Sequence, residues 1–350
     1  MTAQLTQAAG PQAARSARLR LRRRAAVVTA SLALVALLLF AVTMLIGDAP
    51  LTLWEITTSL TGIVDDPAVD FIVLELRLPI AATGLIVGMA LGVSGLIFQT
   101  LLANPLASPD LVGISSGASL FAVGSIVFLH AGALTIAGSA ILGALVAAAL
   151  IYLLAWRDGL SSYRFILVGI GITQFMLALV SWVLAKADIN DARQAMTWLV
   201  GSVGQAGSVQ LQLAACSVAI LIPLSVMSGR VLHVLELGDD SAHALGLRIE
   251  RWRMAMIGIA IVLVALATAA AGPLAFVALA TGPIAGRLLR GAGTGMSAAA
   301  LTGAIIVLAS DLVASHLLPI SLPTGVVTGA VGAPYLIWLL ATVNREGRGG

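Results

Sequence analysis

Residues 76–119 read LRLPIAATGLIVGMALGVSGLIFQTLLANPLASPDLVGISSGAS, and they indicate the fold class more clearly than any other part of the chain. Its apolar segment Leu78–Leu102 is long enough to cross a bilayer as a helix. Gly84, Gly88 and Gly92 recur every four residues, so they lie on one face of that helix. Small residues at this spacing let two helix backbones approach closely in lipid, where packing drives association. We therefore predict that these glycines form a helix-packing face.

A polar turn, Asn104–Asp110, ends the apolar segment and leads into a second apolar run rich in glycine and serine. Two closely spaced apolar segments joined by a short polar turn predict a tight helical hairpin. From spacing alone, a generic hairpin explains this stretch as well as a specialised one does.

The composition is that of a membrane protein that crosses the bilayer several times. The chain has 350 residues, of which 59% are hydrophobic and only 10% charged, and its mean hydropathy is +1.05. A soluble domain of this length needs more charge on its surface. Cys216 is the only cysteine and the four histidines have no ligand spacing, so we predict neither a disulfide nor a metal site. The basic residues flank apolar segments, which favours a role in topology over nucleic-acid binding.

Ten apolar segments predict about ten transmembrane helices in an all-α fold, at residues 25–47, 78–102, 112–130, 133–156, 162–186, 207–228, 252–271, 274–290, 296–317 and 324–343. The eighth is short and is interrupted by Gly282 and Pro283. We expect one transmembrane domain over 25–344, a basic disordered tail over 1–24 and a short tail over 345–350. Most of the 19 basic residues then lie on the side of the N-terminus, so both termini are predicted to be cytoplasmic.

Two outer segments are substantial. Residues 47–77 are acidic and partly amphipathic, and residues 187–206 are predicted to include a short interfacial helix. Trp198 in this segment is typical of a membrane-interface anchor.

Asp311 is the one strong case of an ionisable residue inside a predicted span. We interpret it as a capped aspartate facing the bundle, with a proton path as the alternative.

Enzymatic signatures are absent from the sequence. No GxxxxGK[ST] phosphate loop occurs, and neither GxSxG nor HExxH is present. Gln99, Thr173 and Gln174 are neutral polar residues within predicted spans. Hydrogen bonds between helices are the default interpretation, with lining of the transport pathway as the alternative. The sequence therefore favours transport over catalysis.

Several motifs resemble the FecCD-type permeases of ATP-driven importers for ferric siderophores, haem and cobalamin. They are LRLP, the glycine-stepped helix, QTLL, NPLASPDLVGISSGA and LPTGVVTGAVGAPYLIWLL, spread over roughly Leu76–Leu340. The resemblance implies the type II ABC importer fold of the cobalamin permease, with ten helices per subunit and two subunits around a central pathway. It also implies ABC ATPase subunits, a second permease subunit and an extracytoplasmic substrate-binding protein as partners. ATP and magnesium would bind the ATPase subunits, with no cofactor on this chain.

The same resemblance assigns roles to three groups of residues. The loop over 229–252 would couple to the ATPase through Glu236, Leu237, Gly238, Asp239, Asp240, Ala242, Leu245 and Gly246. The cytoplasmic gate would comprise Asn104, Leu106, Gly159, Leu160, Ser161 and Ser162. Docking of the binding protein would use Arg77, with help from Lys186 or Arg193.

The chain departs from the family pattern at three places. Ile80 and Ser315 stand where the cobalamin permease carries docking arginines, and Thr281–Ile284 replaces an Ala-Pro-His-Ile motif of many relatives. The missing arginines make cobalamin a less favoured cargo than a ferric siderophore, with haem left open. They also tilt the expected pairing slightly towards two different permease subunits.

The resulting prediction is an importer permease of the inner or plasma membrane that works by alternating access. A secondary transporter driven by an ion gradient is the alternative from another class. It predicts functional intramembrane carboxylates and inverted repeats, whereas the sequence shows one peripheral aspartate and no convincing repeat. An intramembrane enzyme would need a catalytic pair within the bilayer, and no such pair is evident.

Overall fold

The computed structural model is a bundle of helices, and it describes residues 11–47, 49–63, 66–156, 162–235, 238, 242, 244–293 and 295–346. Within these ranges no residue lies in a strand, as the sequence predicts for an all-α chain. Seven helical stretches are long and apolar enough to cross a membrane. They are Leu19–Leu45 in α1 (Pro11–Leu45), Pro67–Leu101, α7 (Ala133–Ala155), α8 (Ser162–Leu184), α10 (Ser208–Met227), α13 (Ile249–Ala271) and Met296–Leu317.

The stretch Pro67–Leu101 joins α3 (Pro67–Asp70), a π-helical segment (Phe71–Arg77) and α4 (Leu78–Leu101). The stretch Met296–Leu317 joins α15 (Met296–Leu312) and a second π-helical segment (Val313–Leu317). Three further apolar helices are shorter: α6 (Ile114–Leu129), α14 (Val277–Leu289) and residues 324–339 of α16 (Thr324–Glu346). Together these helices account for all ten predicted segments.

Helix α14 begins later than its predicted segment because the backbone turns before it. Gly272 and Phe276 both adopt left-handed φ values, of 71° and 65°, and Pro273 between them lacks the N–H that a continuing helix would use. The 13-residue helix is therefore shorter than a full span, which agrees with the predicted interruption of this segment.

The N-terminal helix extends further than the sequence suggests. Helix α1 begins at Pro11, so the part of the predicted disordered tail from 11 to 24 is helical. Its alanine, arginine, leucine and glutamine residues all have high helix propensity, and the basic cluster continues the first span without a break. Residues 1–10 lie outside the described chain.

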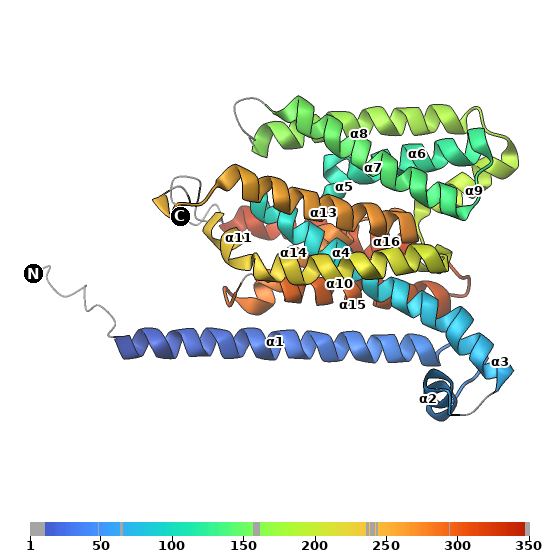
Figure 1. The fold of residues 1–350 in the computed structure, drawn as a ribbon, viewed down its shortest axis with the longest axis horizontal. Coiled ribbons are helices and arrows are strands. Elements are labelled where there is room, and N and C mark those ends of the chain that lie inside the picture. Colours follow the sequence, from blue (N-terminus) through green and yellow to red (C-terminus); the bar gives the residue numbers. More distant parts are fainter. Residues whose placement is uncertain are drawn as a thin grey trace, which may run out of the picture.

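Helix α4 runs through the interior of the bundle (Figure 1), and the glycine face packs it against α15. A Cβ atom added to Gly88 would lie 2.5 Å from the Gly303 carbonyl oxygen and 2.6 Å from the Ala304 Cα. One added to Gly92 would overlap the Ala299 carbonyl, and one added to Gly84 would meet the Leu308 side chain. Glycine at these positions is therefore what lets the two backbones touch.

The two ends of the bundle differ in charge and in the elements they carry. At one end, Arg24 of α1 donates a hydrogen bond of 3.1 Å to the Leu288 carbonyl oxygen of α14. The guanidinium of Arg287 at the same end of α14 lies 4.4 Å from the ring centroid of Trp338 in α16. Helices α1 and α16 therefore both contact α14 at the basic end of the bundle. At the opposite end lie α2 (Leu53–Thr61), α3 and α9 (Ile189–Val200) (Figure 1).

Local capping explains the start of α2. Thr52 and Glu55 form a capping box at the start of α2, and the hydrogen bonds from Thr52 lower the pKa of Glu55. Helix α9 is the short helix predicted within residues 187–206. Its Trp198, however, is only 9% exposed and packs inward. The prediction of a membrane-interface anchor at Trp198 is therefore wrong, because α9 turns this face towards the bundle.

Candidate functional site

A cavity of about 650 Å³ opens at the basic end of the bundle, where the predicted gate and coupling segments meet. Asn104 lines it from the turn after α4, and Ser162 lines it from the first residue of α8. Gly238 contributes from the loop after α11 (Gly229–Leu235). Three residues that the sequence places in separate segments thus surround one space.

The turn after α4 is fixed by its own hydrogen bonds. The Asn104 side-chain oxygen accepts a hydrogen bond of 2.9 Å from the Leu106 N–H, and the Asn104 carbonyl accepts one of 3.0 Å from the Ala107 N–H. Ala103 adopts a left-handed φ of 48°, which reverses the chain at the helix end. A turn held in this way can present Asn104 and Leu106 in a defined position.

The departure from the family pattern at Thr281–Ile284 lies in the same cavity wall. The Gln99 side chain donates a hydrogen bond of 3.0 Å to the Leu279 carbonyl oxygen, which joins α4 to α14. A Cβ atom on Gly282 would overlap the Gln99 side-chain oxygen. The Gln99 amide can therefore occupy this position only because residue 282 is glycine. Gln99 therefore makes the hydrogen bond between helices that the sequence predicted as the default.

The short helix that follows the gate turn carries a buried carboxyl group. Ser108 caps α5 (Pro109–Val112), and the Ser115 hydroxyl donates a hydrogen bond to Asp110 Oδ1. Burial raises the pKa of Asp110 to about 6, and the Ser115 hydrogen bond opposes part of that rise. The sequence predicts no separate role for Asp110, because the residue order does not show that the folded chain buries its carboxyl group.

Part of the predicted coupling group lies within the described chain. The Ala242 N–H donates to the Gly238 carbonyl oxygen at 3.1 Å, and the Leu247 N–H donates to the Ala242 carbonyl at the same distance. Gly246 adopts a left-handed φ of 77° that ends this helical turn, while Leu245 is 65% exposed. The other predicted residues lie outside the described chain: Glu236, Leu237, Asp239 and Asp240 of the coupling group, and Gly159, Leu160 and Ser161 of the gate.

Arg77, the principal residue predicted to dock the binding protein, is buried in the structure. It is 8% exposed, and its guanidinium donates hydrogen bonds to the carbonyl oxygens of Met44 at 2.7 Å and Leu45 at 3.1 Å. A third hydrogen bond reaches the carbonyl oxygen of Ala49. The guanidinium therefore caps the C-terminal end of α1, which favours a structural role.

The two auxiliary docking residues are exposed at the same outer end. Lys186 follows α8, and Arg193 lies on α9. Arg193 also lines a second cavity, of about 510 Å³, between α9 and the outer ends of α6, α7 and α13. Nothing in the residue order indicates this outer cavity, because its lining comes from segments that are far apart in the chain.

Asp311 lies in the bundle interior, 5% exposed, near the outer end of α15. The Thr324 hydroxyl donates a hydrogen bond of 2.9 Å to Asp311 Oδ1, and Thr324 also accepts a hydrogen bond from the Val203 N–H. This geometry is the capped, bundle-facing arrangement that the sequence predicts for Asp311 in preference to a proton path. The hydrogen bond between Thr324 and Asp311 therefore holds the start of α16 against α15.

These features define a polytopic membrane transport subunit, with a close-packed interior and cavities at both ends of the bundle. The chain belongs to the FecCD transport family, whose model matches residues 33–342. As the motifs indicated, it is a permease subunit of the type II ABC importer class, and not itself an enzyme. Family members work with ATPases and binding proteins.

Named relatives agree with this assignment. The chain is 39% identical over 302 residues to the ferric enterobactin transport system permease protein FepG of Escherichia coli strain K12, covering 86% of this chain and 91% of FepG. It is 37% identical over 299 residues to the achromobactin transport system permease protein CbrC of Dickeya dadantii, covering 84% and 85%. A solved inward-facing metal-chelate type ABC transporter shares the fold, with a TM-score of 0.80, 24% identity, and coverage of 90% of this chain and 98% of that one.

Proposed function

We propose that this permease imports a ferric siderophore across the inner or plasma membrane, driven by ATP hydrolysis in separate ABC ATPase subunits. The observation that carries the proposal is its 39% identity to a ferric enterobactin permease over most of both chains. Relatives named for hemin and vitamin B12 import match at 34% and 36% identity, so these cargoes are the alternatives within the family.

In this proposal the gate and the coupling loop act through the cavity at the basic end. Closure of the ATPase subunits on ATP would push on residues 236–247, and the motion would reach Asn104 and Ser162 across the cavity that Gly238 shares with them. Both termini would lie in the cytoplasm, because arginines gather at this end. The pathway would run between this chain and a second permease subunit, with a substrate-binding protein docked on the outer end.

The cargo can be tested by uptake in the native host after deletion of the gene for this chain. We expect loss of radioactive iron uptake from a ferric siderophore at least tenfold below the wild-type rate, with restoration by a plasmid copy. Uptake of vitamin B12 and of hemin should be unchanged. Loss of vitamin B12 or hemin uptake with normal iron uptake from every siderophore tested would contradict the proposed cargo.

A further inference from the structure

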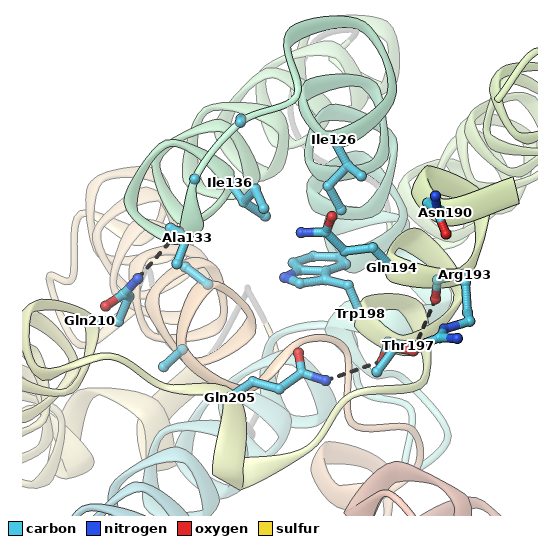
Figure 2. Close-up of a pocket in the computed structure, with 14 residues that line it drawn as sticks. Ile126, Ala133, Ile136, Asn190, Arg193, Gln194, Thr197, Trp198, Gln205 and Gln210 are labelled. Atoms are coloured by element: carbon cyan, nitrogen blue, oxygen red, sulfur yellow. Dashed lines mark hydrogen bonds between the residues drawn. The ribbon is translucent and has the colours of Figure 1, made fainter. Parts of the chain in front are cut away.

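The outer cavity combines the size and the polarity of a small-ligand site. Its volume of about 510 Å³ lies within the range of roughly 300–1,000 Å³ that is typical of small-molecule pockets. Ile126 and Ile136 form an apolar wall, and the rest of the lining includes four carboxamides, a hydroxyl, an indole and a guanidinium. Figure 2 shows Gln194 and Trp198 extending from α9 towards the opposite wall, where Ala133 and Ile136 lie.

Trp198 presents an unused hydrogen-bond donor to this cavity. Its side chain is nine-tenths buried, and within the described chain its indole N–H donates no hydrogen bond. The N–H lies at the open cavity, so a ligand oxygen there can accept its hydrogen bond. Within the same described chain, Arg193 forms no ion pair, which leaves a positive charge at the edge of the cavity.

Two of the four carboxamides donate hydrogen bonds to backbone carbonyl oxygens of the surrounding chain. Gln205 donates to the Thr197 carbonyl oxygen at 3.2 Å, and Gln210 donates to the Ala133 carbonyl at 3.3 Å. No carboxylate is among the described residues that line the cavity. Asp191, the neighbouring acid on α9, is instead paired with His130, with 3.2 Å between Oδ2 and Nδ1. The electrostatic balance therefore favours an anionic ligand that is rich in oxygen acceptors.

We propose that this cavity is a binding subsite for the anionic oxygen-rich face of the iron chelate on the outer side of the permease. The inference rests on the proposed function and adds a location and recognising residues to it. The Trp198 indole N–H and the Gln194 carboxamide donate to chelate oxygens, and Arg193 attracts the negative charge. A single acidic side chain of the binding protein is too small to fill a space of this volume, so a small molecule fits the cavity better.

The test uses the complete importer, purified with its native partners and held in nanodiscs of zwitterionic phosphatidylcholine. Equilibrium binding of a radioactive ferric tricatecholate chelate is measured for the wild type, Trp198→Phe, Gln194→Glu and the control Trp54→Phe. Trp54 lies on α2, 69% exposed, and lines neither cavity. We expect an approximately tenfold weaker affinity for Trp198→Phe, the effect of one charge-assisted hydrogen bond, and a larger loss for Gln194→Glu through charge repulsion. The control should bind as the wild type does.

The possible outcomes distinguish failure of the proposed subsite from failure of the proposed function. The proposed subsite would be overturned if cells import the ferric chelate at the wild-type rate and all four proteins bind it with equal affinity. The proposed function would then still stand. A loss of affinity for the binding protein alone would also overturn it and identify a docking surface instead. Competition with the chelate by anionic phosphatidylglycerol would assign the site to a lipid headgroup. Failure of the wild type to import or bind any ferric chelate would remove the proposed function itself.

Discussion

Replacing Gly88 with leucine is expected to reduce the folded permease to a small fraction of its wild-type yield. Even a Cβ atom at this position would lie 2.5–2.6 Å from backbone atoms of Gly303 and Ala304, so no side-chain rotation can relieve the clash. Overpacking typically costs about 1–3 kcal/mol, and a contact with backbone should reach or exceed the upper value. A loss of about 3 kcal/mol corresponds to roughly a hundredfold shift in an equilibrium constant.

The measurement is the monodisperse peak of a fluorescent fusion in mild detergent, compared with total expression. Gly138→Leu is the matched control, because it adds the same side chain to α7 where no atom lies within 4 Å of the added Cβ. It should fold at nearly wild-type yield. Equal yields for Gly88→Leu and Gly138→Leu would show that α4 and α15 do not touch as described.

Replacing Arg77 with methionine is expected to destabilise the permease in the absence of any binding protein. The substitution keeps much of the apolar stem but removes hydrogen bonds to the carbonyl oxygens of Met44, Leu45 and Ala49 at the end of α1. Leaving a buried acceptor without a donor costs about 1–3 kcal/mol per group. We therefore expect a total loss on the order of 3 kcal/mol, seen as a lower thermal midpoint of the purified complex.

The exposed residues Lys186 and Arg193 provide the controls for this prediction. Lys186→Glu and Arg193→Glu should leave the thermal midpoint unchanged, and weaken binding-protein docking if either residue contributes to it. A docking role for Arg77 makes the opposite prediction, namely normal thermal stability with weaker binding-protein affinity. That result for Arg77→Met would refute its assignment as a helix cap.

The residues around α4 show why much of this fold could be predicted from the sequence. The length of the apolar segment predicts a spanning helix, and the recurrence of Gly84, Gly88 and Gly92 every four residues predicts a packing face on it. The structure places this glycine face against α15. The sequence could not show which helix would meet that face, because Gly303 lies more than 200 residues away in the chain. Periodicity identifies a packing face, whereas its partner depends on the topology of the whole bundle.

Arg77 and Trp198 show the corresponding limit for functional sites. Trp198 was interpreted from its residue type and its position near a membrane boundary, and Arg77 from the family resemblance, yet the bundle buries both side chains. Arg77 became a cap because α1 ends beside it, and Trp198 became a cavity wall because α9 turns inward. Burial arises from contacts between distant segments, so the residue order alone could not show that these two side chains are enclosed.

Isolation of the tagged chain from native membranes in mild detergent would show whether this permease is coupled to separate ATPases. Mass spectrometry should identify an ABC ATPase together with the tagged permease. A second permease of similar length would show a heterodimer, and its absence beside an ATPase would indicate a homodimer. Recovery of the folded chain without any ATPase would contradict the account and favour a transporter driven by an ion gradient.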